Sequence, residues 1–430
     1  MRLGGRIAAA IEVLDDTAKR RRPVADALKD WGLAHRFAGS GDRAAIGNIV
    51  YDVLRRRRSL GWRMGDDSPR ALVFAALMEA QGLDAAAILE ALEGDRHAPG
   101  MPNEATLQRF SAADLAAAPA AVQADLPDWL AAEFAASLGD DWIAEAVALA
   151  ARPPLDLRVN TLLATRDATE ADLAPFSAAP TAIAPNGLRI PPIEGAGRHP
   201  NVQVESGFQK GLFEVQDEGS QIAAHLVGAL PGEDILDFCA GAGGKTLALA
   251  AAMKGEGRLH AFDADKQRLA PIYERLKRAE AGNVDVHGPR DDLAALGLMD
   301  RVVVDAPCTG AGTWRRRPDA KWRLSASAVE KRIAEQDAVL DAAARFVKPG
   351  GTLAYITCSL LARENSDRVA SFLSRHKDFI AADATALWTT ALPGAEPAYR
   401  ATAAGAGQAL TLTPRLTGTD GFFFASLVRT

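Results

Sequence analysis

The segment DILDFCAGAGGKTLALA (residues 234–250) decides the fold class, because an apolar strand-like run passes through a glycine-rich turn into a helical pattern. Further strand and helix patterns alternate from there to the C-terminus. This alternation predicts a doubly wound, largely parallel α/β sheet with helices on both faces over residues 221–430. Ligands of such sheets bind beyond the carboxyl ends of the strands, where the strand order reverses. We expect the last strand, FFFASLVR (422–429), to run antiparallel.

Two further domains precede this sheet in the sequence. Residues 1–125 predict an all-α domain, since Ile46, Ile49, Val50 and Val53 recur at helical spacing and Asp42 stands where a helix N-cap is expected. Residues 126–220 predict a small α/β subdomain. Its strands are LDLRVNTLL (155–163) and PNGLRIPP (185–192), and a helix lies between them. The chain is therefore expected to be multidomain.

The composition narrows the class of protein. The chain has 430 residues, a net charge of −6 and only three cysteines. No apolar run approaches the ~18 residues of a membrane span, and the N-terminus lacks the features of a signal peptide. The cysteines form no paired framework and stand at no zinc-like spacing. We therefore expect a cytoplasmic monomer with no membrane and no metal.

Basic residues gather in three runs, KRRR (19–22), RRRR (55–58) and RRR (315–317). Because screening acts over ~8–10 Å, such runs can bind phosphate even in an acidic protein. The alternative for each is an ordinary solvated helix face or turn. The third run belongs to TWRRRPDAKWR (313–323), where two tryptophans among cations favour stacking with splayed RNA bases. A loop with buried tryptophans is the alternative there.

The glycine-rich turn comprises Cys239, Ala240, Gly241, Ala242, Gly243, Gly244 and Lys245. A phosphate-binding P-loop needs glycine at position 239, and the G-x-G-G spacing does not match the dinucleotide fingerprint. What remains is a close backbone approach to a ligand, with Asp263 at the end of the next strand. A carboxylate there accepts hydrogen bonds from both hydroxyls of a ribose. S-adenosyl-L-methionine, which has a ribose and no phosphate, suits this arrangement; a purely structural turn is the alternative.

Two cysteines follow strand-like runs. RVVVDAPCTG (301–310) places Asp305 and Cys308 at the end of one run, and LAYITCSLL (353–361) places Cys358 at the end of another. An acid and thiols facing a cofactor pocket suggest methylation of carbon 5 of cytosine. There a thiolate adds to carbon 6, an acid assists at N3, and a base removes the carbon 5 proton. The residues alone leave the two thiols interchangeable, and each could instead be a small buried apolar residue.

These segments together resemble the motifs of the RNA (cytosine-5) methyltransferases. The matching segments are DFCAGAGGKT (237–246), HAFDAD (260–265), VVVDAPCTGAGTWRRRPDAKW (302–322), ITCSLLARENSDRV (356–369), FEVQDEGSQ (213–221) and TDGFFFASLVR (419–429). The helical front, with DRAAIGNIVYDVLRRR (42–57), is similar to the NusB-type RNA-binding domain of the bacterial ribosomal RNA branch. The resemblance implies a Rossmann-like class I methyltransferase domain and an RNA substrate, with ribosomal RNA favoured.

The resemblance also implies a role for each site residue. Cys358 is the nucleophile that attacks carbon 6, and Cys308 assists product release, as the base or together with it. Asp305 holds the cytosine edge at N3 and borders the cofactor, with Lys245 nearby. The cofactor lies against residues 239–245 and takes its ribose contact from Asp263.

The chain departs from the family pattern at two places. Gly241-Ala242 replaces an alanine-proline pair, and Pro289 in HGPRDD (287–292) replaces an acid expected to contact the adenine. Asp291, Asp292 or a backbone group is the expected substitute. Two other functions stay open, a DNA cytosine-5 methyltransferase with Cys308 as nucleophile, and a non-catalytic RNA-binding factor in ribosome assembly.

Overall fold

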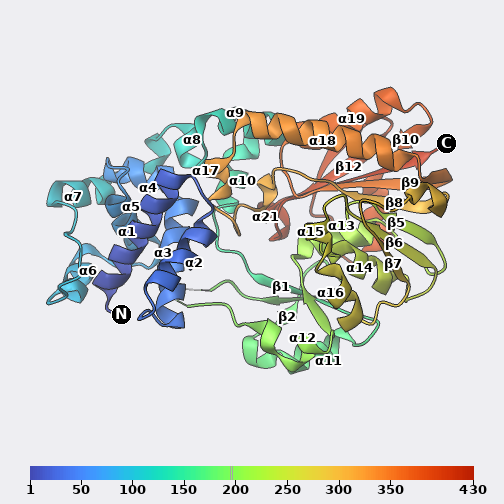
Figure 1. Cartoon of the computed structure of the whole chain (residues 1–430). Coiled ribbons are helices and arrows are strands. Elements are labelled where there is room, and N and C mark those ends of the chain that lie inside the picture. Colours follow the sequence, from blue (N-terminus) through green and yellow to red (C-terminus); the bar gives the residue numbers. More distant parts are fainter. Residues whose placement is uncertain (194, 196) are drawn as a thin grey trace. The chain divides into compact units, whose positions relative to one another are not determined.

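The computed structural model describes residues 1–193, 195 and 197–430, and the chain divides into two compact units (Figure 1). Unit 1 contains Met1–Pro153, Pro192–His199 and Trp314–Leu324. Unit 2 contains Pro154–Pro191, Pro200–Thr313 and Ser325–Thr430. Residues 126–153 thus pack with the helical front, and residues 154–191 pack with the large sheet. The division into three domains, residues 1–125, 126–220 and 221–430, remains a prediction.

Unit 1 is helical in its N-terminal part, as the sequence pattern predicts. Ile46, Ile49, Val50 and Val53 are at most 2% exposed and lie in its core. The helices are α1 (Leu3–Arg20), α2 (Val24–Ala34), α3 (Ser40–Arg55), α4 (Arg57–Met64), α5 (Pro69–Ala80), α6 (Ala85–Leu92), α7 (Glu104–Ala112), η1 (Leu115–Ala117), α8 (Ala120–Gln123), α9 (Asp128–Leu138), η2 (Gly139–Asp141) and α10 (Trp142–Ala148).

The N-cap prediction at Asp42 is wrong, because α3 begins at Ser40 after Gly39. Asp42 lies in the first turn of this helix. Its carboxylate accepts hydrogen bonds from the N-terminal amine at 3.0 Å and from Arg6 at 2.8 Å. The acid therefore joins α1 to α3.

The segment Trp314–Leu324, which includes α17 (Ala320–Arg323), packs inside unit 1. Trp314 is 1% exposed and stacks on Phe134 with ring centroids 5.4 Å apart. Arg55 donates a hydrogen bond to the Arg315 carbonyl at 2.6 Å, and Lys321 donates one to the Arg55 carbonyl at 2.8 Å. Trp314, Arg315 and Lys321 are all buried, so the prediction of RNA contact is wrong for these three side chains. Arg317 and Arg323 are exposed, and RNA contact by the rest of the segment remains a prediction.

The run RRRR is divided between the core and the surface of unit 1, and phosphate binding by its exposed residues remains a prediction. Arg55 is buried, Arg56 pairs with Glu79, and Arg58 pairs with Asp128. In the run KRRR, Arg20 and Arg22 both pair with Asp16. These cations are engaged with acids or carbonyls of their own unit, and they stabilise helix contacts there.

The main sheet of unit 2 has nine strands in the order β11-β12-β13-β9-β8-β5-β6-β7, with β10 paired to β13. β7, β6, β5, β8 and β9 are parallel neighbours, and the order reverses between β5 and β8. As expected, β13 runs antiparallel to β9. The strands are β5 (Asp234–Asp237), β6 (Arg258–Phe262), β7 (Val284–His287), β8 (Met299–Asp305), β9 (Val347–Thr357), β10 (Phe379–Ala381), β11 (Arg400–Ala404), β12 (Gly407–Leu412) and β13 (Phe422–Arg429).

Helices cover both faces of this sheet and form two separate apolar cores. In Figure 1, α18 and α19 lie along one face, and α13, α14 and α16 lie along the other. The segment KQRLAPIYERLKRAEA (266–281) has a helical pattern, and the structure splits it at Pro271 into α15 and α16. The helices are α13 (Glu218–Leu226), α14 (Gly244–Ala252), α15 (Lys266–Leu269), α16 (Ile272–Arg278), η5 (Leu293–Leu296), η6 (Ala311–Thr313), α18 (Ala326–Ala344), η7 (Ala362–Glu364), α19 (Ser366–Arg375), α20 (Ala384–Ala391) and α21 (Pro414–Thr417).

A smaller sheet of four antiparallel strands has the order β2-β3-β1-β4. Its two longest strands match the predicted ones, and a helix follows β1 as expected. The elements are β1 (Leu155–Val159), α11 (Arg166–Asp172), η3 (Ala174–Phe176), β2 (Ala179–Pro180), β3 (Gly187–Ile190), η4 (Val202–Val204), α12 (Ser206–Gln209) and β4 (Phe213–Val215).

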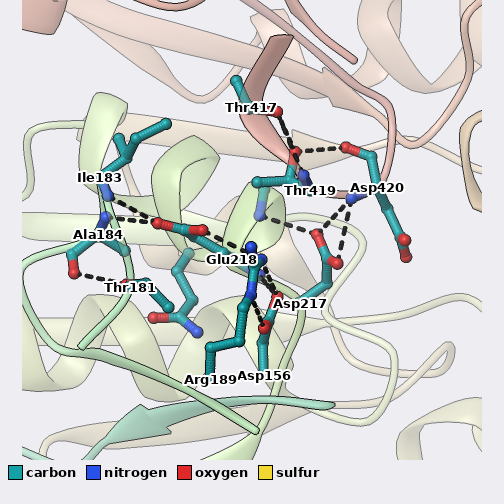
Figure 2. A network of polar contacts seen from close by, with 12 residues as sticks. Asp156, Thr181, Ile183, Ala184, Arg189, Asp217, Glu218, Thr417, Thr419 and Asp420 are labelled. Carbon is teal, nitrogen blue, oxygen red and sulfur yellow. Dashed lines mark hydrogen bonds and ion pairs between the residues drawn. The ribbon is translucent and has the colours of Figure 1, made fainter. Parts of the chain in front are cut away.

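A buried polar network attaches this small sheet to the start of α13 (Figure 2). Arg189 forms a bidentate pair with Asp156 at 2.6 and 2.8 Å and lies 3.2 Å from Glu218. Asp217 accepts the Asp420 amide at 3.0 Å, so the network also reaches the loop before β13. The segment FEVQDEGSQ therefore acts as a structural junction, which holds α13 beside the strand ends that carry the site.

Candidate active site

The carboxyl ends of β5, β6, β8 and β9 bring the predicted site residues to one edge of the sheet. The turn Cys239–Lys245 follows β5, Asp263 follows β6, Asp305 ends β8 and Cys358 follows β9. Because these four strands are parallel neighbours, their carboxyl ends lie on the same side. The reversal of strand order between β5 and β8 lies at the centre of this edge.

Lys245 and Asp305 form an ion pair at this edge, with Nζ 2.7 Å from Oδ2. Lys245 lies in the first turn of α14 and is 5% exposed. Its ammonium also contacts the Ser220 hydroxyl at 3.3 Å and lies 5.2 Å from the centroid of the Phe422 ring. The Asp305 side chain keeps 34% of its surface exposed, so its carboxylate is held from one side and open to a ligand on the other.

The sulfur atoms of Cys308 and Cys358 lie 3.4 Å apart, although 50 residues separate them in the sequence. The Gly312 amide donates to the Cys358 carbonyl at 2.9 Å, and the Gly421 amide donates to the Gly312 carbonyl at 2.8 Å. A Cβ atom on Gly312 would lie 2.2 Å from the Gly421 carbonyl oxygen, so glycine is required for this approach. These contacts join the loop after β8, the loop after β9 and the loop before β13 beside the thiol pair.

The environment of Cys308 disfavours a thiolate on its sulfur. The hydrogen bond with Cys358, burial, and the negative charges of a Cys358 thiolate and of Glu364 raise the pKa of Cys308 well above its usual value. Cys358 is likewise half-buried. The two thiols therefore share one site and act on each other electrostatically.

The turn after β5 and the acid after β6 fit the ribose of a nucleoside cofactor. Asp263 is 4% exposed, and its Oδ2 accepts the Gly241 amide at 2.9 Å while Oδ1 accepts the Asp265 amide at 2.8 Å. Each carboxylate oxygen has a further lone pair for a ribose hydroxyl. Gly241 has a φ of 51°, a conformation that favours glycine, and this brings its backbone to Asp263.

Asp237 and Cys239, which lie next to the glycine-rich turn, are surrounded mainly by the protein interior. Asp237 is fully buried, its Oδ2 accepts the Thr246 hydroxyl at 2.7 Å, and burial raises its pKa to about 7. Burial likewise raises the pKa of the Cys239 thiol well above its usual value, and Cys239 packs against the core under α18. Cys239 remains a predicted cofactor contact through its place in the turn.

At the end of β7, the residues proposed to replace the missing acid have local partners. Asp291 accepts the Gly288 amide at 2.8 Å, and Asp292 accepts the Ala294 amide at 3.0 Å at the start of η5. Asp291 thus folds back over the Gly288-Pro289 turn. It remains the better placed of the two for a contact with adenine, because its carboxylate lies at the strand end itself.

Sequence reasoning missed one group at this edge, Glu364, which is fully buried between the two cysteine loops. No pattern in the segment ARENSDRV marks it. Among the described residues, no group of three or more His, Cys, Asp or Glu side chains has a geometry suited to a metal ion. Within the same residues, no single helix is long and apolar enough to cross a membrane, and one bent pair, α5 with α6, meets the length and composition criteria jointly.

Comparison with known proteins agrees with this geometry. Residues 225–428 match the family described as 16S rRNA methyltransferase RsmB/F, and residues 126–192 match the ferredoxin-like domain of RsmF/B-like methyltransferases. The crystal structure of PH0851 superposes on the whole chain with a TM-score of 0.72 at 24% identity, covering 100% of both chains, which shows a shared fold.

Curated relatives extend the match beyond the catalytic sheet. A probable ribosomal RNA small subunit methyltransferase B from Synechocystis is 31% identical over 95% of this chain and 96% of its own length. The ribosomal RNA small subunit methyltransferase B of Pectobacterium atrosepticum is 33% identical over 70% of this chain and 66% of its own length. The chain therefore belongs to the RsmB/F family of 16S rRNA methyltransferases, which take their methyl group from S-adenosyl-L-methionine.

Proposed function

We propose that this chain methylates carbon 5 of a cytidine in ribosomal RNA through a covalent cysteine adduct at carbon 6. The observation that carries the proposal is the thiol pair, whose sulfur atoms lie 3.4 Å apart. Cys308 follows β8 and Cys358 follows β9, and these two strands are parallel neighbours. A cytosine ring bound there would meet two sulfurs and the Asp305 carboxylate on one side of the sheet. The names of the curated relatives support ribosomal RNA as the substrate.

The proposed roles follow the chemistry that each group allows. Cys358 attacks carbon 6 as a thiolate, which makes carbon 5 nucleophilic. Asp305 accepts a hydrogen bond from the cytosine amino group and, when protonated, donates to N3, which assists the attack on carbon 6; Lys245 holds this side chain in place from behind. Cys308 assists product release in its thiolate form: the thiolate takes the carbon 5 proton as the bond between the Cys358 sulfur and carbon 6 breaks, and Cys358 leaves as a thiolate. The raised pKa of Cys308 makes this thiolate, once formed, more basic than that of an ordinary cysteine.

When bound, S-adenosyl-L-methionine supplies an electrophilic methyl group. Asp263 would accept the ribose hydroxyls, and the backbone of the turn Cys239–Lys245 would lie against the nucleoside. Asp291 is proposed as the acid nearest to the adenine. The helical unit is proposed as the NusB-like RNA-binding part, although the buried residues of the segment Trp314–Leu324 take no part in that contact.

Two single variants test the proposal and the division of roles. Cys358→Ala should abolish methylation, because no nucleophile remains for carbon 6. Cys308→Ala should form the adduct without releasing it, and a covalent RNA–protein species should accumulate as a slow band in a denaturing gel. If Cys358→Ala keeps full activity while Cys308→Ala is inactive without an adduct, the two roles are reversed.

The substrate is tested separately from the mechanism. Bisulfite sequencing of ribosomal RNA from a deletion strain should show one or more cytidines that lose protection relative to the parent strain. The unmethylated RNA should regain the mark when incubated with the purified chain. Unchanged ribosomal RNA together with a change in DNA methylation would favour the DNA methyltransferase instead.

A further inference from the structure

We infer that Glu364 is a positioning residue for the reaction, a single buried carboxylate that fixes the loop of Cys308 and the loop of Cys358 relative to each other. The inference rests on the proposed function for its kinetic readout, and on geometry alone for its chemical readouts. Glu364 ends η7, is fully buried, and lies six residues after Cys358 in the sequence.

The carboxylate of Glu364 holds one neighbour of each catalytic cysteine. Oε1 accepts the backbone amide of Thr309 at 2.8 Å, and Oε2 accepts the Thr309 hydroxyl at 2.5 Å. Oε2 also accepts the Ser359 hydroxyl at 2.5 Å. Thr309 follows Cys308 and Ser359 follows Cys358, so one side chain joins both loops directly beside the sulfur atoms.

Another set of contacts restrains the carboxylate itself. Gln336 from α18 donates to Oε1 of Glu364 and to the Pro307 carbonyl, both at 3.0 Å. The Tyr355 hydroxyl donates to the Glu364 carbonyl at 2.5 Å. Asn365 donates to the Ser359 carbonyl at 2.9 Å and accepts the Thr357 hydroxyl at 2.6 Å. The residues on both sides of each cysteine are therefore joined by one buried network of hydrogen bonds, which restrains the carboxylate.

The charge of Glu364 has an effect separate from its hydrogen bonds. Its negative charge contributes to the raised pKa of Cys308, after the larger contributions of Cys358 and burial. It therefore helps to keep Cys308 protonated while Cys358 acts. Geometry and charge can be separated by substitution, because glutamine keeps the shape and loses the charge.

The expected behaviour of Glu364→Gln follows from the donors around it. Its amide oxygen, at the position of Oε1, can accept from the Thr309 amide and from Gln336. Its NH₂ group, at the position of Oε2, would face two hydroxyls that can rotate to accept. This variant should keep the loops joined, whereas Glu364→Ala should release them.

The distance between the sulfurs can be measured chemically in the full chain. Diamide takes two electrons and two protons from a thiol pair and is reduced to the hydrazine as the disulfide forms, and peptide mapping identifies the cysteines that are joined. Wild type and Glu364→Gln should form the Cys308–Cys358 disulfide at similar rates. Glu364→Ala should form the disulfide at least about 10-fold more slowly, since small misplacements of two reacting groups greatly lower the rate of their reaction. Glu330→Gln is the matched control, because Glu330 is an exposed acid paired with the neighbouring Arg363.

Alkylation and kinetics complete the test. The pH profile of Cys308 alkylation by iodoacetamide should move to lower pH in Glu364→Gln and stay unchanged in Glu330→Gln. Methylation by Glu364→Ala should show a kcat reduced about 10-fold or more with KM for RNA unchanged, because substrate binding does not use this carboxylate.

The outcomes separate the inference from the proposed function. Equal disulfide rates in wild type and Glu364→Ala, with equal kcat, would overturn the inference. If Glu364→Ala does not fold, the double variant Thr309→Val/Ser359→Ala, which removes both hydroxyl contacts of the carboxylate, takes its place, and a disulfide rate equal to that of wild type would overturn the inference. If wild type makes no 5-methylcytidine while the thiol measurements behave as expected, the proposed function fails and the positioning role stands.

Discussion

Two short stretches that follow each other in the sequence, residues 305–310 and 313–323, have opposite fates in the structure. The first begins at Asp305, the last residue of the buried strand β8, and its Asp305 and Cys308 are partly exposed. Residues 313–323 have the composition better suited to RNA, with two tryptophans and five cations, yet Trp314, Arg315 and Lys321 are buried within unit 1. The difference teaches that position at a strand end predicts where a polar side chain is presented at the edge of the sheet better than residue type does.

The physical reason lies in what each stretch is attached to. The ends of parallel strands must leave the sheet at one edge, so polar residues there are presented together whatever their number. A loop between elements has no such constraint, and tryptophan contributes most when it is buried. Arginine and lysine side chains can be buried beside it where backbone carbonyl groups accept their hydrogen bonds, as the carbonyls of Arg55 and Arg315 do.

The largest effect is expected at Asp305. Asp305→Asn should lower kcat/KM for RNA by about 10²–10⁴-fold, because the cytosine edge loses its acid and Lys245 loses its partner. Thermal unfolding of the variant should stay close to that of wild type, since the carboxylate is partly exposed. Steady-state methylation and a melting curve on the same preparation check both statements. An unfolding defect with normal activity would remove the contrast between the two stretches.

The next largest effect is expected at Trp314, and it should be a loss of stability rather than a loss of activity. Trp314→Ala should lower the free energy of unfolding by about 3–5 kcal/mol, because a large buried ring leaves a cavity beside Phe134. Urea denaturation measures this change. Trp314→Phe should recover a substantial part, because it can still stack on Phe134. An unchanged unfolding free energy, together with weaker RNA binding, would restore the RNA-contact interpretation of this stretch.

The smallest effect is a pH dependence at Lys321. Burial lowers the pKa of this lysine from 10.5 to about 8. Between these values the unfolded chain binds a proton that the folded chain does not, so the lysine's contribution to stability rises with pH from about 8 to 10.5 and is lost as pH falls. The difference in unfolding free energy between wild type and Lys321→Met should change in that direction over this window. A pH-independent difference would mean that Lys321 is accessible to water.

Much of unit 2 could be predicted from the sequence. The strands around Ile235, Val303 and Ile356 are short apolar runs that end in turn residues, and this pattern predicts parallel strands directly. The position of Asp263 after one strand and Asp305 after another then places both at one edge. β10, β11 and β12 were not predicted, because their sequences do not show a clear alternation of apolar and polar residues.

Other features depend on tertiary contacts that no local pattern records. Glu364 is one acid among several in its segment, and only the fold brings Thr309 beside it. α3 begins at Ser40, and the Asp42 carboxylate contacts the N-terminal amine instead of capping the helix. The assignment of residues 314–324 to unit 1 depends on the fit of Trp314 against Phe134.

The central claim is that Cys358 is the sulfur that bonds to the cytosine ring. The most direct test of this claim uses unmethylated ribosomal RNA in which 5-fluorocytidine replaces cytidine. Carbon 5 then carries fluorine in place of the hydrogen that must leave as a proton, so the adduct is trapped on the wild-type chain. After protease and nuclease digestion, mass spectrometry should find the nucleotide on the peptide that contains Cys358. A nucleotide on the peptide that contains Cys308, or no adduct in the presence of S-adenosyl-L-methionine, would contradict the account.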